Sequence, residues 1–185
     1  VGGTNVAVGA TIAIGGTGLG AITWGAEAVV TDGGSGGDDP YIVDAGSDTI
    51  NNLNGSDVLM VYGDATATAS GVTNFVATAA TKNLGTVTIN ASDVGSTIDL
   101  SLAAAISGTT ATKGFTVVGG TGVDTITGSS KGDVMTGGAG NDVFVIGQDD
   151  YVNFDTITDF ATTADKLDMD VAGAVGNYVE VDGTG

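Results

Sequence analysis

Histidine, cysteine and arginine are all absent from this 185-residue chain, and proline occurs only once. Without cysteine no disulfide can form, and without cysteine and histidine the usual zinc sites and the Ser-His and Cys-His nucleophile systems are excluded. No G-x-x-x-x-G-K-[ST] phosphate loop occurs. Carboxylate pairs of the glycosidase kind carry little information in a chain with so many Asp residues. We therefore expect that this chain is not an enzyme.

Basic residues are scarce, since 22 acidic side chains are set against four lysines and the formal net charge is −18. Such a field makes nucleic acid and anionic membranes poor partners. Twenty of the acids are Asp and only two are Glu. Asp is short, favours turns and is a good ligand for hard cations such as Ca²⁺. The charge pattern therefore indicates acidic turns that bind Ca²⁺.

Aromatic side chains make up only 5% of the chain, whereas glycine accounts for 33 residues. This composition suits thin sheets and tight turns better than packed helices. Residues 1–32 begin with an uncharged, glycine-rich stretch that would make a poor transmembrane helix, so we expect N-terminal strands there, at 11–14 and 21–24, and a candidate interface. No signal peptide is visible, and we interpret the chain, which starts at Val1, as a segment or a processed protein.

Three consecutive nonapeptides occupy residues 119–145, namely GGTGVDTIT, GSSKGDVMT and GGAGNDVFV. Asp occupies the sixth place of each block, as Asp124, Asp133 and Asp142, and an apolar residue follows two places later. Nonapeptides of the form G-G-x-G-x-D-x-U-x are the repeat of calcium-binding parallel β-helices. Three blocks in a row with fixed Gly and Asp therefore predict a calcium-binding tract.

A second and more degenerate tract covers residues 33–63 and contains GDDPYIVDA, GSDTINNLN and GSDVLMVYG. Asp39, Asp48 and Asp57 again lie nine residues apart, each followed two places later by an apolar side chain. We interpret these three residues as further metal ligands.

The nine-residue period has a simple physical explanation. Each block makes one glycine-containing loop and one short strand whose U side chain points inward. Two blocks complete one coil, so residues 18 apart lie above one another, which pairs Asp124 with Asp142 and Asp39 with Asp57. Loop carbonyls and these carboxylates together can supply the oxygen shell that Ca²⁺ requires. The predicted fold is an all-β parallel β-roll, or β-solenoid, with calcium ions between its turns.

Residues 64–118 lack the Gly/Asp period and carry short β-rich runs at 87–89, 97–100 and 115–118. We interpret them as metal-poor β-solenoid rungs that join the two tracts. Two Ala-rich stretches, 75–82 and 102–106, are candidates for a short helix instead. Three acids in this region have no repeat partner and are expected to be ordinary turn or surface carboxylates: Asp64, Asp93 and Asp99.

Residues 146–185 are expected to form a capping segment. Asp155 lies 22 residues beyond Asp133, which corresponds to one 18-residue coil with a four-residue insertion. Asp155 could therefore close the ion site that Asp133 opens on the opposite side of the roll. The alternative is a polar loop before a capping strand.

With its nonapeptides followed by DTITDF and DKLD, the chain resembles the RTX, or hemolysin-type, calcium-binding family. The resemblance is close from Gly119 to about Asp170 and loose from Gly33 to Val61. It implies secretion by a bacterium, usually through a type I exporter, and folding where calcium is abundant. By residue match it also implies metal contact for Asp124, Asp133 and Asp142, for Asp155, and for carbonyls near Gly119, Thr121, Gly137 and Ala139. GSSK at residues 128–131 replaces the family's G-G-x-G, and the cationic Lys131 argues against carbonyl ligands from that block.

Two functions are compatible with this pattern. The first is a calcium-dependent structural module at the bacterial cell surface, such as a surface layer, filament or adhesin, that self-associates or binds other surface components. The second is the calcium-folded C-terminal secretion domain of an exported toxin or hydrolase. We favour the first because nothing catalytic is present. In both cases we expect the metal-free acidic chain to repel itself and to fold only when Ca²⁺ binds.

Overall fold

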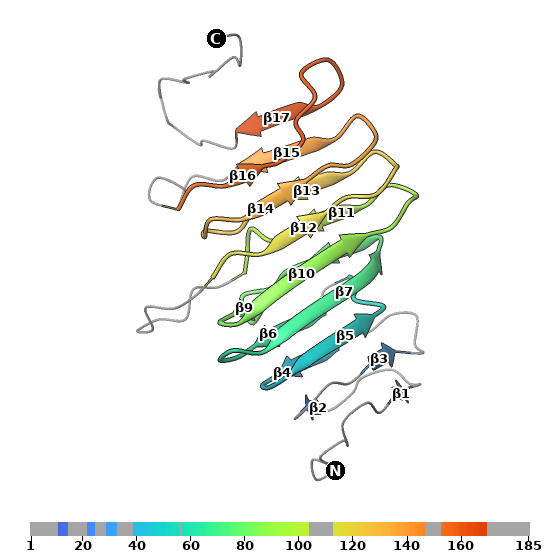
Figure 1. Ribbon diagram of the computed structural model, residues 1–185, viewed down its shortest axis with the longest axis vertical. Coiled ribbons are helices and arrows are strands. Elements are labelled where there is room, and N and C mark those ends of the chain that lie inside the picture. Colours follow the sequence, from blue (N-terminus) through green and yellow to red (C-terminus); the bar gives the residue numbers. More distant parts are fainter. Residues whose placement is uncertain are drawn as a thin grey trace.

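All the described secondary structure is β-strand, and every pair of adjacent strands is parallel. The computed structural model describes residues 11–14, 22–24, 29–32, 39–55, 57–103, 113–146 and 153–169. The strands stack from β1 at one end to β17 at the other (Figure 1). This is a β-solenoid, as the nine-residue period predicts. No helix in the described part of the chain is long and apolar enough to cross a membrane.

Three sheets form the sides of the solenoid. The eight-stranded sheet runs the whole length and contains β1 (Thr11–Ile14), β3 (Val29–Asp32), β5 (Ser47–Asn51), β7 (Thr66–Val72), β10 (Thr86–Ala91), β12 (Thr116–Val118), β14 (Val134–Thr136) and β16 (Thr156–Ile157). The four-stranded sheet contains β2 (Ile22–Trp24), β4 (Pro40–Val43), β6 (Val58–Val61) and β9 (Lys82–Asn83). The five-stranded sheet contains β8 (Asn74–Val76), β11 (Thr97–Asp99), β13 (Thr125–Thr127), β15 (Val143–Ile146) and β17 (Lys166–Met169).

The middle of the chain joins the two shorter sheets. N-terminal coils alternate between the eight- and four-stranded sheets, whereas C-terminal coils alternate between the eight- and five-stranded sheets. The coil formed by β7, β8 and β9 contributes one strand to each sheet. Strands at residues 87–89, 97–99 and 116–118 lie where the sequence predicts them, in the same sheets as the flanking tracts.

The proposed helix at 75–82 is wrong. This stretch begins in β8, passes through a turn and ends in β9. Phe75 and Ala77 alternate with outward-facing residues and are both buried, so sheet pairing and burial outweigh the helix preference of Ala. Of the second helix candidate, 102–106, only residues 102 and 103 are described, and they lie in and after a turn, so the rest lies outside the described residues.

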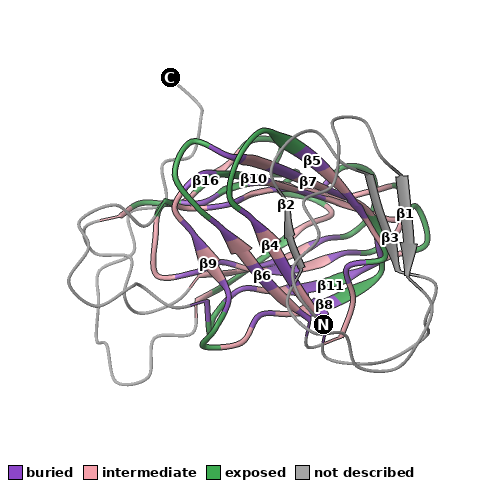
Figure 2. Cartoon of the chain, turned by 90° about the horizontal axis from the view of Figure 1, so that it is seen from below, coloured by how far each residue is buried: buried purple, intermediate pink, exposed green. Residues whose placement is uncertain are grey.

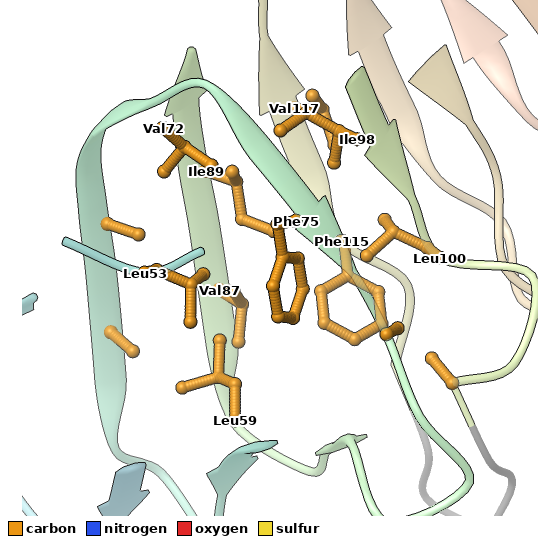
Figure 3. Close-up of a cluster of buried hydrophobic side chains, with 14 of the residues drawn as sticks. Leu53, Leu59, Val72, Phe75, Val87, Ile89, Ile98, Leu100, Phe115 and Val117 are labelled. Atoms are coloured by element: carbon orange, nitrogen blue, oxygen red, sulfur yellow. The ribbon is translucent and has the colours of Figure 1, made fainter. Parts of the chain in front are cut away.

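The buried residues form one core cluster, and buried and half-buried residues alternate along the strands (Figure 2). In the five-stranded sheet, Phe75, Ile98, Ile126 and Phe144 lie above one another in register and are fully buried. In the cluster between the sheets, Phe75 and Phe115 lie next to each other (Figure 3). All six U positions of the two tracts are buried: Tyr41, Ile50, Leu59, Ile126, Met135 and Phe144.

Candidate metal centre

The sixth-place Asp residues of both tracts are buried in the solenoid, although ordinary turn carboxylates would be exposed. Each is at most 2% exposed, and they are the only buried acidic side chains in the described part of the chain: Asp39, Asp48, Asp57, Asp124, Asp133 and Asp142. None of the four lysines, all of which are described, is buried. The three acids that the sequence assigns to ordinary turns, Asp64, Asp93 and Asp99, are exposed or half-buried.

The carboxylates form three columns, in each of which a residue lies directly before a strand. The first column contains Ser96, Asp124, Asp142 and Asp165, before β11, β13, β15 and β17. Asp124 accepts the Ser96 N–H at 2.6 Å, Asp142 accepts the Asp124 N–H at 2.8 Å, and Asp165 accepts the Asp142 N–H at 3.0 Å. Residues 18 apart therefore stack as the repeat predicts, and Asp165 extends the column by one coil.

The second column lies on the opposite side and contains Phe115, Asp133 and Asp155, before strands of the eight-stranded sheet. Asp133 accepts the Phe115 N–H at 2.6 Å, and Asp155 accepts the Asp133 N–H at 2.8 Å. Asp155 thus lies over Asp133 despite the 22-residue spacing. The third column, before the four-stranded sheet, contains Asp39 and Asp57, and Asp57 accepts the Asp39 N–H at 3.0 Å.

Asp48 is separate from these columns. It lies within β5, and its partner in the next strand is Ala67. No carboxylate therefore stacks on Asp48 from the C-terminal side, and the structure does not bring it together with Asp39 or Asp57 as one set of ligands.

In the tract at 119–145, the glycine that opens each block has its Cα against the carboxylate of the same block. A Cβ on Gly137 would lie 2.5 Å from Asp142 Oδ2, and one on Gly119 would lie 2.6 Å from Asp124 Oδ2. Later glycines of the loops also have no room for a side chain. Gly138, at a φ of 89°, lies directly over the Gly120 carbonyl oxygen, and a Cβ there would overlap that oxygen. The two glycine loops therefore stack with their carbonyls close to the first column.

The other carbonyl positions predicted as ligands lie in the same loops. The Gly137 carbonyl oxygen lies directly against Gly119. The Ala139 N–H donates to the Gly120 carbonyl at 3.0 Å, and the exposed Thr121 hydroxyl donates to the Asp93 carbonyl at 3.1 Å. In the GSSK loop, which lacks this glycine pattern, Ser129 donates to Asp133 through both its N–H and its hydroxyl.

Asp142 differs from Asp124 and Asp133 in the hydrogen bonding of its Oδ2 atom. Asp124 Oδ2 accepts the N–H of Gly120, four residues earlier, and Asp133 Oδ2 accepts the N–H of Ser129 in the same way. The equivalent N–H for Asp142 belongs to Gly138, but it donates to Asp159 Oδ2 at 2.7 Å instead. Asp142 Oδ2 is consequently buried without a hydrogen-bond partner.

Burial raises the pKa of the Asp142 carboxyl; the Asp124 N–H lowers it, and the nearby carboxylates of Asp124, Asp165 and Asp159 raise it further. Burial also raises the pKa of Asp133, although the N–H groups of Phe115 and Ser129 oppose this shift. Both ionised carboxylates are therefore destabilised in the fold without a cation. At Asp142 the Asp124 N–H satisfies a hydrogen bond but does not remove the repulsion from the neighbouring carboxylates.

The residues around Asp142 fit a calcium ion. The side-chain and carbonyl atoms that could bind a metal here are all oxygens, which a hard cation prefers. Among them, Asp142 Oδ2 is buried and accepts no hydrogen bond. Within the described residues, no three acidic side chains form a metal cluster by themselves. An ion here would therefore need carbonyl oxygens from the stacked glycine loops besides Asp142 and its neighbours.

Asp159 and Asp165, which the sequence analysis does not single out, lie beside the predicted ligands. Asp159 accepts the N–H groups of Gly137 and Gly138, and Asp165 accepts those of Asp142 and Ala161. Both lie in the DTITDF and DKLD motifs, and their separations from Gly137 and Asp142 are 22 and 23 residues. These separations exceed the 18-residue coil by four and five residues, as the separation of Asp155 from Asp133 does by four. The same spacing argument could therefore have placed Asp159 and Asp165 beside the site.

The chain matches no protein-family profile, and neither a curated protein nor a solved structure matches it. The assignment of the site therefore depends on the geometry described above.

The raised pKa values predict how the metal-free fold depends on pH. A folded state with raised carboxyl pKa values binds protons more tightly than the unfolded chain, so its stability is greatest below the ordinary Asp pKa of about 3.9 and falls as pH rises through the raised values. We expect metal-free protein to show more β-structure by circular dichroism near pH 4 than at pH 7. The double variant Asp133→Asn/Asp142→Asn should flatten this profile. A metal-free β signal that increases with pH would contradict the expectation, and light scattering identifies any precipitation.

Proposed function

We propose that this chain is a calcium-dependent structural module of the bacterial cell surface, of the kind found in a surface layer, filament or adhesin. In this proposal Ca²⁺ binds between the coils, and folding and self-association follow. The observation that carries it is the burial of six periodic carboxylates in a chain in which no lysine is buried. Burying ionised carboxylates is costly unless opposite charge is close by, and a divalent cation between coils would supply that charge.

The site around Asp142 supports calcium in particular. Ca²⁺ takes six to eight oxygen ligands in flexible geometry, which suits a mixture of carboxylates and loop carbonyls. Mg²⁺ demands a nearly ideal octahedron at shorter distances and keeps several waters. The first column with its glycine loops offers the donors that Ca²⁺ prefers.

An extracellular location is part of the proposal and has a thermodynamic argument. Calcium sites of extracellular modules bind with Kd values of about 10⁻⁴–10⁻³ M, which only extracellular calcium concentrations saturate. A chain with a formal charge of −18 that folds on such sites would remain unfolded inside a cell and fold after export.

Self-association on calcium binding tests the structural role. We expect sedimentation velocity at pH 7 to show a monomer in chelator and larger species in millimolar Ca²⁺, because bound ions reduce the charge repulsion between copies. Millimolar Mg²⁺ is the matched control and should leave the chain monomeric. If the calcium-bound protein is folded but stays monomeric at all accessible concentrations, the assembly role is wrong while calcium binding stands.

A further inference from the structure

The outer face of the eight-stranded sheet has a uniform chemistry. From β5 to β16, none of the outward-facing residues carries a charge or an aromatic ring. One outward column contains five threonines and a valine in continuous register, Thr49, Thr68, Thr88, Thr116, Val134 and Thr156. The outer face of the five-stranded sheet, by contrast, carries Asp99, Lys166 and Asp168. An uncharged face of this size is unexpected on a chain with a charge of −18.

The threonine face forms a two-dimensional lattice. Adjacent parallel strands lie about 4.8 Å apart, and outward residues along one strand lie about 6.6 Å apart. The column from Thr49 to Thr156 follows the first repeat, while Thr66 with Thr68, and Thr86 with Thr88, follow the second. The strands run nearly parallel to one another, so the repeat continues along the stack (Figure 1). β-Branched side chains have few rotamers, which keeps the hydroxyl and methyl groups in place.

The hydroxyl groups of this column are available for binding. Within the described part of the protein, those of Thr49, Thr68, Thr88 and Thr116 make no hydrogen bond to other protein groups. Each can therefore hold a water molecule, with a methyl group beside it. Waters held at the two spacings of the sheet would form an ordered layer, and hexagonal ice repeats along its axes at distances close to these two.

We infer that this face binds ice. Other partners fit less well, because crystalline polysaccharides are held on aromatic platforms and this face has none, and nucleic acid needs a positive charge that it also lacks. A second copy of the chain would cover about 400 Å² over the six strands from β5 to β16, well below the roughly 800 Å² per partner of a stable interface. The inference depends on the fold and does not require the proposed surface-layer role.

Adsorption to ice tests the inference directly. Folded protein in Ca²⁺ should be incorporated into a slowly growing ice crystal and should separate the melting from the freezing temperature. Thr68→Tyr/Thr88→Tyr places two bulky rings in the centre of the column and should reduce both signals to those of a protein that does not bind ice. Thr127→Tyr, at an outward position of β13 in the five-stranded sheet, is the matched control and should keep both.

Circular dichroism and calcium titration of each variant show whether the solenoid is intact, so loss of folding is distinguished from loss of the face. Exclusion of the folded wild-type protein from ice would overturn the inference, as would full adsorption by Thr68→Tyr/Thr88→Tyr. Neither result would alter the calcium proposal, which is measured separately by the titration.

Discussion

Removal of calcium at pH 7 is expected to abolish most of the β-sheet circular dichroism signal of this protein. At millimolar Ca²⁺ and a Kd of about 10⁻⁴–10⁻³ M, a ligand that binds only the folded state contributes about 0.4–1.4 kcal/mol per site. About four such ions would contribute roughly 2–6 kcal/mol, which is a large part of the stability of a typical domain. They would also reduce the formal charge from −18 to about −10. Without them, the buried carboxylates have no divalent counterion.

The experiment is a calcium titration of chelated protein followed by far-UV circular dichroism, with Mg²⁺ titrated in parallel. We expect a cooperative gain of β-structure with Ca²⁺ and little with Mg²⁺. An unchanged β signal after complete chelation would show that the amide-to-carboxylate bonds stabilise the solenoid alone, and the calcium proposal would then fail.

The second large effect is that of Asp142→Asn. We expect this substitution to destabilise the calcium-bound protein but not the metal-free protein. Asp142→Asn should weaken calcium binding at the first column by at least about tenfold, or about 1.4 kcal/mol, because it removes a ligand whose Oδ2 has no other partner. In the metal-free protein the same substitution should be neutral or stabilising, because it removes a buried charge whose pKa is raised by burial and by Asp124, Asp165 and Asp159.

Asp64→Asn is the matched control, since it makes the same chemical change at an exposed turn and should alter neither quantity appreciably. The readouts are calcium affinity by calorimetry, the urea midpoint at pH 7 in Ca²⁺, and, without Ca²⁺, the circular dichroism signal as pH rises from 4 to 7, the range over which the Asp142 charge develops. If Asp142 had a purely structural role, Asp142→Asn would change the stability in the same direction with and without Ca²⁺. Destabilisation by Asp142→Asn in the metal-free protein would therefore contradict the assignment.

Much of the C-terminal half follows from the nine-residue period. Once Asp124 and Asp142 are placed one coil apart, the stacking of Ile126 on Phe144 follows, because side chains on one strand alternate between the two faces. The position of Asp155 over Asp133 also followed from the spacing, because a loop can absorb four extra residues without changing the strand register.

The middle of the chain could not be predicted in this way. Coils there advance by 20, 22, 23 or 28 residues, for example from Thr66 to Thr86 and from Thr97 to Thr125, so no fixed period exists. In the region where the four-stranded sheet gives way to the five-stranded sheet, Phe75 and Phe115 are buried side by side, and such packing does not follow from residue spacing. Asp159 was missed for a related reason, since it bonds to glycine amides and not to another sixth-place Asp.

The bonds within the columns all point the same way, and this gives the molecule a direction. In each pair the carboxylate belongs to the later coil and the amide to the earlier one. The amide that precedes a strand in one coil is therefore hydrogen-bonded to a carboxylate only after the next coil toward the C-terminus has formed. The last nonapeptides are hydrogen-bonded by the final carboxylates, Asp155, Asp159 and Asp165. A chain that emerges N-terminus first would therefore lack these hydrogen bonds in its C-terminal coils until the segment with the final carboxylates had folded onto them.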